Sequence, residues 1–233
     1  FSFLFIPAQN FNWGSKATGP ASDGGYSITI DKNGDLYAVG EFTNSIDIDP
    51  GPGVTTFSST GGTNGYLVKL TANGAFIWAR HLKCKSSVTI PWVVRTDAFG
   101  DIYVTGWFGD STNFDVGFTN TTLGAKSGMY ECFIAKWSSN GNFIWAKKFG
   151  GLFAVNSFHL DMTIDNSGNL FLTGSLDRKS DFDPSPSSFS LTPNLGSEDV
   201  FIMKTDLNAN LIWAEMMGGT SPDVGNGIDF DVS

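Results

Sequence analysis

SSNGNFIWAKKFGG, residues 138–151, combines a Ser-Asn-Gly turn, an apolar run around Trp145, two lysines and a double glycine. The chain repeats this pattern as TANGAFIWARHLKC at 71–84 and LNANLIWAEMMGG at 207–219, and in part as NFNWGSKATG at 10–19. The tryptophans that align are Trp13, Trp78, Trp145 and Trp213. They lie 65, 67 and 68 residues apart, which indicates a repeat of about 67 residues.

Two further phrases recur at the same spacing. An Asp-x-x-Gly turn followed by an apolar run appears as DKNGDLYAVG at 31–40, DAFGDIYVTG at 97–106 and DNSGNLFLTG at 165–174. Its recurring residues are Asp31, Gly34, Asp97, Gly100, Asp165 and Gly168. A lysine also recurs nine residues before each of the last three tryptophans, and these lysines are Lys69, Lys136 and Lys204.

Each unit contains four predicted strands, A to D, with the A–B and C–D pairs joined by short Gly/Asn turns that are typical of hairpins. The strand centres are apolar on both faces, which indicates a sheet covered on both sides. We therefore predict an all-β fold, a β-propeller built of four-stranded antiparallel blades. Its three complete repeats occupy about 20–83, 84–151 and 152–219. A solenoid is the alternative, although its repeats are usually shorter.

Partial repeats flank the three complete ones. Residues 10–19 match strand D only, and 227–233 match strand A only, within a further blade that starts at 220–233. A leading strand D that completes the last blade is the way in which propellers close, and propellers typically have four to eight blades. We therefore expect a partial propeller, completed by further blades of the same chain or by a second copy.

The joint pattern of Asp-x-x-Gly turn, lysine strand and tryptophan strand resembles the secreted bacterial β-propeller repeats often called SBBP repeats. The resemblance covers almost all of the chain from residue 10, and the departures are modest: Cys84 replaces a glycine, and Asn208-Ala209 replaces Asn-Gly. It implies a part of an exported or cell-surface bacterial protein. No common enzymatic activity belongs to that repeat.

Composition limits the partners. The net charge of −9 disfavours nucleic acid and anionic membranes. No apolar run reaches the roughly 20 residues of a membrane helix. The run FSFLFI with the following Pro-Ala, residues 1–8, resembles the remnant of a signal peptide before a mature region 9–233, and an apolar edge strand is the alternative. Cys84 and Cys132 could form one disulfide, but we favour two separate buried thiols.

Loop lengths suggest where a ligand would bind. The A–B and C–D turns fall at one end of every blade and are short, whereas the B–C and D–A connections are long and differ between copies. Variable loops on a rigid scaffold are where binding sites normally lie. We therefore expect a non-catalytic binding or structural module that contacts a protein or carbohydrate ligand through these connections.

Acidic pairs in two of the long connections could bind calcium. They are Asp47 and Asp49 in the first repeat and Asp181 and Asp183 in the third, each followed by proline, while the second repeat keeps only Asp115. Carboxylates and backbone carbonyls are calcium ligands. Aspartates that cap a turn are the alternative, and we favour it, so no cofactor other than possible calcium is expected.

A second acidic pair, Asp161 and Asp229, occupies the same predicted strand-A position in successive blades, where strand A lines the central channel. Two carboxylates at one height could bind a cation or form the acid/base pair of a carbohydrate-active or other hydrolase. A hydrated channel wall is the simpler interpretation, since supporting catalytic groups are absent. His81 and His159 lack metal-ligand spacing, and no nucleophile motif appears.

Overall fold

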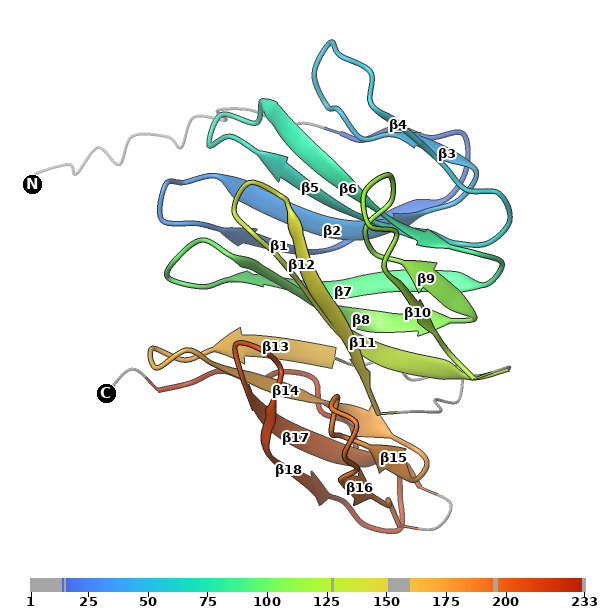
Figure 1. Cartoon of the computed structure of the whole chain (residues 1–233), viewed down its shortest axis with the longest axis vertical. Helices are drawn as coiled ribbons and strands as arrows, with labels where there is room; N and C mark the ends of the chain where they lie inside the picture. Colours follow the sequence, from blue (N-terminus) through green and yellow to red (C-terminus); the bar gives the residue numbers. More distant parts are fainter. Residues whose placement is uncertain (1–13, 15, 127, 151–159, 195–196, 232–233) are drawn as a thin grey trace, which may run out of the picture.

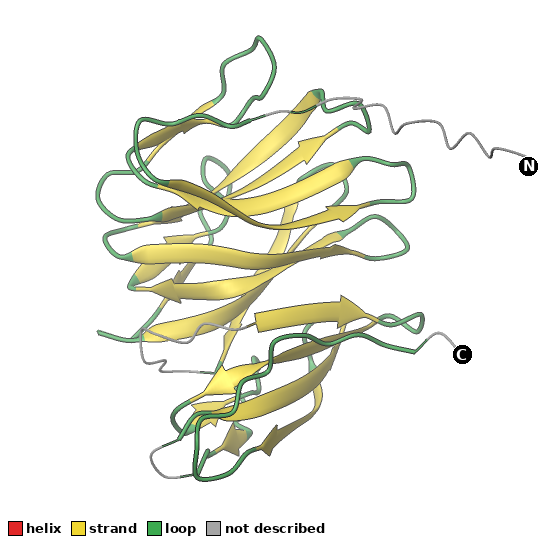
Figure 2. Ribbon diagram, turned by 180° about the vertical axis from the view of Figure 1, so that it is seen from behind, coloured by secondary structure: helices red, strands yellow, loops and turns green. Residues whose placement is uncertain are grey.

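The computed structural model describes residues 14, 16–126, 128–150, 160–194 and 197–231. The described residues form strands and loops without a helix, so the all-β prediction is confirmed (Figure 2). Three four-stranded antiparallel units lie one above another with the strands of neighbouring units facing each other (Figure 1). This arrangement is that of β-propeller blades.

The strand order in each blade is A-B-C-D, as predicted. Blade one consists of β1 (Asp23–Ile30), β2 (Leu36–Phe42), β5 (Asn64–Leu70) and β6 (Phe76–Cys84). Blade two consists of β7 (Val88–Thr96), β8 (Ile102–Gly109), β11 (Tyr130–Trp137) and β12 (Phe143–Phe149). Blade three consists of β13 (Leu160–Ile164), β14 (Asn169–Leu176), β17 (Asp199–Asp206) and β18 (Leu211–Met217).

Each B–C connection contains a small hairpin that the sequence pattern did not predict. The hairpin strands are β3 (Ser45–Asp47) with β4 (Thr56–Ser58), β9 (Ser111–Asn113) with β10 (Thr122–Gly124), and β15 (Ser180–Asp181) with β16 (Ser190–Leu191). Each hairpin also pairs with the end of the preceding strand D. The residues paired across this junction are Thr18 with Asp47, Cys84 with Thr112, and Gly150 with Asp181.

This pairing places the hairpins at the outer rim of the propeller. In the sheet order β1-β2-β5-β6-β9-β10, the hairpin of blade two lies beyond the outermost strand of blade one. The long connections therefore extend along the rim, in addition to covering the end of the blade opposite the short turns. Two adjacent blades are thereby joined by backbone hydrogen bonds as well as by side-chain packing.

The short turns close through a glycine with positive φ. In the first, the amide of Asp31 donates to the carbonyl of Asp35 at 2.9 Å, and the amide of Gly34, with φ of +84°, donates to the carbonyl of Asp31 at 2.9 Å. Such a three-residue loop needs one left-handed residue. Ala209 takes this conformation in the last C–D turn, with φ of 54°.

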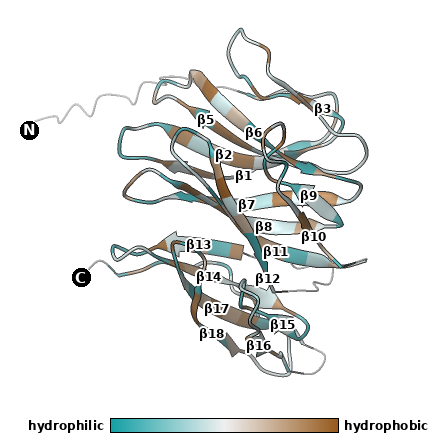
Figure 3. Ribbon diagram, in the orientation of Figure 1, coloured by the Kyte–Doolittle hydropathy of each residue, from teal (hydrophilic) through white to brown (hydrophobic). Residues whose placement is uncertain are grey.

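The hydrophobic core is divided into layers between the blades. One buried cluster joins Tyr37 and Leu67 of blade one with Val104 and Phe133 of blade two, and a second joins blades two and three. Figure 3 shows the corresponding apolar bands along the centres of the strands, with hydrophilic turns. Each fully buried large side chain contributes about 1.5–3 kcal/mol. Neighbouring blades therefore stabilise one another.

The outermost blades do not pair with each other in the described part of the chain, so the ring is open. On blade one, Ile28 and Ile30 of β1 are 58% and 63% exposed. On blade three, Trp213 is 38% exposed, whereas its equivalents Trp78 and Trp145 pack against the inter-blade clusters. Trp13 and residues 1–8 lie outside the described residues.

The predicted start of a fourth strand A lies beside β13. The amide of Ile228 donates to Asp161 Oδ2 at 3.0 Å, and the hydroxyl of Thr163 donates to Asp229 Oδ1 at 3.3 Å. The described residues of this segment, up to 231, form no regular strand. Side-chain acceptors, rather than a ladder, hold this segment against blade three.

The glycine requirement can be tested at Gly100, whose φ is +88°. An added Cβ would lie 3.5 Å from the Ser139 side chain, so Gly100→Ala introduces backbone strain without a clash. We expect a loss of about 1 kcal/mol in the free energy of unfolding, measured by urea denaturation. Gly124→Ala is the control, because Gly124 has an ordinary φ and open space. Equal stabilities of the two variants would contradict the requirement.

Candidate functional site

The recurring aspartates and lysines meet at the short turns. Asp31 Oδ1 accepts hydrogen bonds from the amides of Asn33 and Asp35 at 2.9 and 3.0 Å, and Tyr37 donates to Oδ2 at 3.1 Å. Lys69 Nζ lies 3.1 Å from Asp35 and 5.0 Å from the centre of the Tyr37 ring. The aspartate organises the turn, and the lysine links it to strand C.

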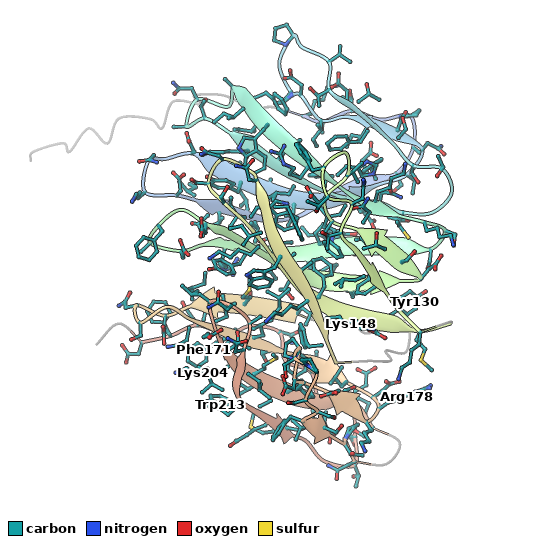
Figure 4. All side chains as sticks on the ribbon, viewed as in Figure 1. Tyr130, Lys148, Phe171, Arg178, Lys204 and Trp213 are labelled. Atoms are coloured by element: carbon teal, nitrogen blue, oxygen red, sulfur yellow. The ribbon has the colours of Figure 1, made fainter. Side chains whose placement is uncertain are left out.

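The equivalent lysines of the other two blades also lie beside an aromatic ring, but their acidic partners differ. Lys136 pairs with Asp101 at 2.9 Å and lies 4.9 Å from the Tyr103 ring. In blade three, Lys204 lies 4.8 Å from the Phe171 ring, and Figure 4 shows both beside Trp213. Because the contacts recur while their details change, these residues belong to the architecture of the blade.

The Asp161 carboxylate lies in a contact between three segments. Its Oδ1 is 3.0 Å from Nη2 of Arg95 in blade two, and its Oδ2 accepts the amide hydrogen of Ile228. Asp229 bonds to Thr163 and to the amide of Phe230, and no hydrogen bond or ion pair among the described residues joins Asp161 to Asp229. The geometry makes Asp161 a link between adjacent strands A. The sequence pattern did not identify Arg95 as its partner.

The acidic pairs of the long connections accept hydrogen bonds from their own loops. Asp47 Oδ1 accepts from the amides of Asp49 and Thr55 at 3.2 and 2.9 Å. Asp181 Oδ1 accepts from those of Asp183 and Phe189 at 3.1 and 2.9 Å. Among the residues that the structure describes, no group of three or more His, Cys, Asp or Glu is placed to hold a metal ion.

A buried polar position at the start of strand C was missed in the sequence pattern. Its residues are Asn64, Glu131 and Asp199, all at most 6% exposed. Asn64 bonds to His81 Nε2 at 2.8 Å, and Glu131 pairs with Lys148 at 2.7 Å. In blade three, Met216 takes the strand-D position, and Asn194 donates to Asp199 instead. Alignment of the three lysine phrases could have identified this polar position in an apolar strand.

His81 has an apolar environment. Its ring stacks on Phe57 with centroids 4.9 Å apart and lies 5.3 Å from the centroid of Phe42. Burial, assisted by the charge of Lys83, lowers the pKa of His81 to about 4. The neutral imidazole is therefore the form that fits the folded blade. His159 lies outside the described residues.

In blades one and two, a cation two residues after the tryptophan makes a second inter-blade contact. Arg80 Nε donates to the carbonyl of Gly141 at 2.6 Å, and Lys147 Nζ donates to that of Asn208 at 2.5 Å. Each cation thus binds the C–D turn of the next blade. Glu215 occupies this position in blade three. The sequence pattern contained these residues but gave no reason to pair them with turn carbonyls.

Cys84 and Cys132 are both buried and free, in agreement with the favoured expectation. Burial raises the pKa of the Cys132 thiol well above its usual range, and the nearby Glu131 acts in the same direction. A protonated, buried thiol is a poor nucleophile. Among the described residues, no helix meets the length and apolarity needed to cross a membrane.

One known protein resembles this chain along most of its length. No protein-family model matches this chain. The chain is similar to an uncharacterized WD repeat-containing protein of Acanthamoeba polyphaga mimivirus, with 25% identity over 260 residues. That match covers 91% of this chain but only 18% of the viral protein. The likeness supports a repeat β-propeller fold.

The His81 environment predicts a pH dependence of stability. Its folded pKa of about 4 lies below the ordinary histidine pKa of 6.5, so the unfolded state binds the proton more readily. The stability from the neutral ring is complete above pH 6.5 and decreases as the pH falls toward 4. We expect His81 to account for a loss of about 2 kcal/mol between pH 7 and pH 5.

The measurement is urea denaturation of the wild type and His81→Gln at both pH values. Glutamine keeps a donor for Asn64 but does not titrate. The stability of the variant should therefore fall by about 2 kcal/mol less than that of the wild type over this range. The same decrease in both proteins would show that His81 titrates normally.

Proposed function

We propose that this chain is a non-catalytic binding or structural β-propeller module of an exported or cell-surface bacterial protein. The bacterial, exported setting rests on the resemblance of the repeats to secreted bacterial propeller repeats. The proposed ligand contacts come from the long connections, above all from the three hairpins at the rim. A ligand would thus meet the segments that differ most between blades.

One observation carries this proposal: each rim connection exposes a large apolar side chain. Val54, Phe118 and Phe189 are 77%, 69% and 42% exposed. The three loops differ in sequence, whereas the blades that carry them are alike. Aromatic residues are enriched at protein interfaces, and variable loops on a rigid scaffold are where binding sites normally lie. The proposed partner is therefore a protein surface that contacts the rim.

The hydrolase alternative receives little support from the geometry. Both Asp161 oxygens have partners in neighbouring segments, one with Arg95 and one with Ile228. An acid/base pair needs carboxylates that face a common substrate position. No contact shows Asp161 and Asp229 doing so. A structural role for Asp161 accounts for all of its described contacts.

The double variant Asp161→Asn/Asp229→Asn separates these alternatives. We expect no turnover of fluorogenic glycosides, esters or peptides by either the wild type or the variant. The variant should unfold about 1–2 kcal/mol more easily, because it loses the Arg95 ion pair. Turnover by the wild type that disappears in a variant of unchanged stability would overturn the non-catalytic assignment.

The rim contact is tested with Val54→Ser/Phe118→Ser/Phe189→Ser. The probe is a fluorescently labelled chain applied to bacterial envelope preparations treated and untreated with protease. We expect protease-sensitive retention that falls by at least about fivefold in the triple variant, because apolar anchors carry most interface energy. Ile28→Ser is the matched control, since Ile28 is an exposed apolar residue of β1 that lies on no rim connection. Equal retention of all three proteins would contradict the rim assignment.

A further inference from the structure

The A–B turns of neighbouring blades differ in how closely they are joined. In blade one, Lys32 extends from the turn, and its Nζ donates to the carbonyl of Ala98 in blade two at 3.3 Å. The equivalent residue of blade two is Ala98, whose methyl group cannot reach blade three. Lys32 therefore bridges the A–B turns of blades one and two, and Ala98 supplies no such bridge to the A–B turn of blade three.

A groove lies at that second junction. Its volume is about 500 Å³, and it runs between the A–B turns of blades two and three beside the last C–D turn. Side chains that line it include Asp97, Phe99, Ile164, Asn166, Ser167 and Leu207. The three short turns lie on the same side of the molecule in both ribbon views (Figures 1 and 2). The groove is thus separate from the rim hairpins.

Phe99 is the residue of this groove that the repeat does not explain. It is 81% exposed, and the equivalent residues of the other turns are Asn33 and Ser167. The turn uses only the backbone amide of Phe99, which donates to Asp97 Oδ1 at 2.9 Å. A polar residue could do the same. The aromatic ring is therefore available to contact a ligand.

The polar groups of the groove suit an uncharged ligand. Asp97 already accepts hydrogen bonds from two amides and from Tyr103, and Asp165 accepts three from Ser167 and Asn169. Their charges are thereby partly compensated, while each carboxylate keeps acceptor capacity for a hydroxyl group. Asn166 and Ser167 are exposed and carry further donors and acceptors. None of the described residues that line the groove is cationic, so an anionic ligand is disfavoured.

We propose that this groove binds the pyranose ring of a neutral carbohydrate. The apolar face of the sugar would stack on Phe99, while its hydroxyl groups donate to Asp97 and accept from the Asn166 amide. An aromatic platform with a few convergent polar groups is the usual composition of a small-molecule site. This site goes beyond the proposed rim function and lies on the side of the molecule with the short turns.

The test is an NMR titration of the ¹⁵N-labelled chain with cellobiose, maltose and N,N′-diacetylchitobiose. We expect at least one disaccharide to shift the backbone amides of residues 97–100 and 165–168 selectively. Phe99→Ser removes the stacking surface, and Ala98→Lys introduces the bridging side chain of blade one. Each should weaken binding at least about fivefold. Ile28→Ser, at an exposed apolar position of β1 outside both proposed sites, should bind as the wild type does.

Three results would overturn the proposal. They are the absence of selective shifts with all three disaccharides, equal binding by the folded Phe99→Ser variant, and tighter binding of the peptide Ac-Gly-Arg-Gly-amide than of any sugar. The last would identify a site for cations instead. Folding of each variant is checked by the dispersion of its amide spectrum. Protease-sensitive retention by envelope preparations tests the rim, and sugar titration tests the groove, so failure of either proposal leaves the other intact.

Discussion

The fold depends on apolar surface that one blade cannot bury alone. Each four-stranded sheet has two apolar faces, and the largest clusters of buried side chains lie between sheets. Polar contacts then fix how the blades are aligned. The rim hairpins pair with the preceding strand D, and cations of strand D donate to carbonyls of the next C–D turn. Asp161 accepts from both Arg95 and Ile228. Hydrophobic burial supplies the energy, and these directional bonds determine the spacing and rotation of the blades.

The strands within a blade could be predicted from the sequence, whereas the contacts between blades could not. The four strands of each blade follow from local patterns, namely a glycine turn and an apolar run, and they were predicted correctly. The hairpins were missed because their strands have only two or three residues and pair with a segment from the preceding repeat. Such pairing depends on how blades stack, and no local pattern records it.

The candidate sites also depend on residues from different blades, which local sequence patterns do not relate to each other. Sequence comparison between repeats identified Asp161 as unusual, but its partner Arg95 lies 66 residues earlier on another blade. The groove beside Phe99 also arises from two consecutive repeats, since its lining residues come from the A–B turns of blades two and three. Sites at junctions become visible only when the neighbouring blades are in place.

The contact two residues after Trp78 and Trp145 restricts the order of the blades. Arg80 and Lys147 each donate to a carbonyl of the following turn, whereas Glu215 carries only acceptors. If blade three preceded blade two, the Glu215 carboxylate would face the carbonyl of Gly141, and two acceptors would repel each other. The repeats are therefore not interchangeable units. Each junction has its own polar contacts, so the sequence specifies the order of the blades as well as their shape.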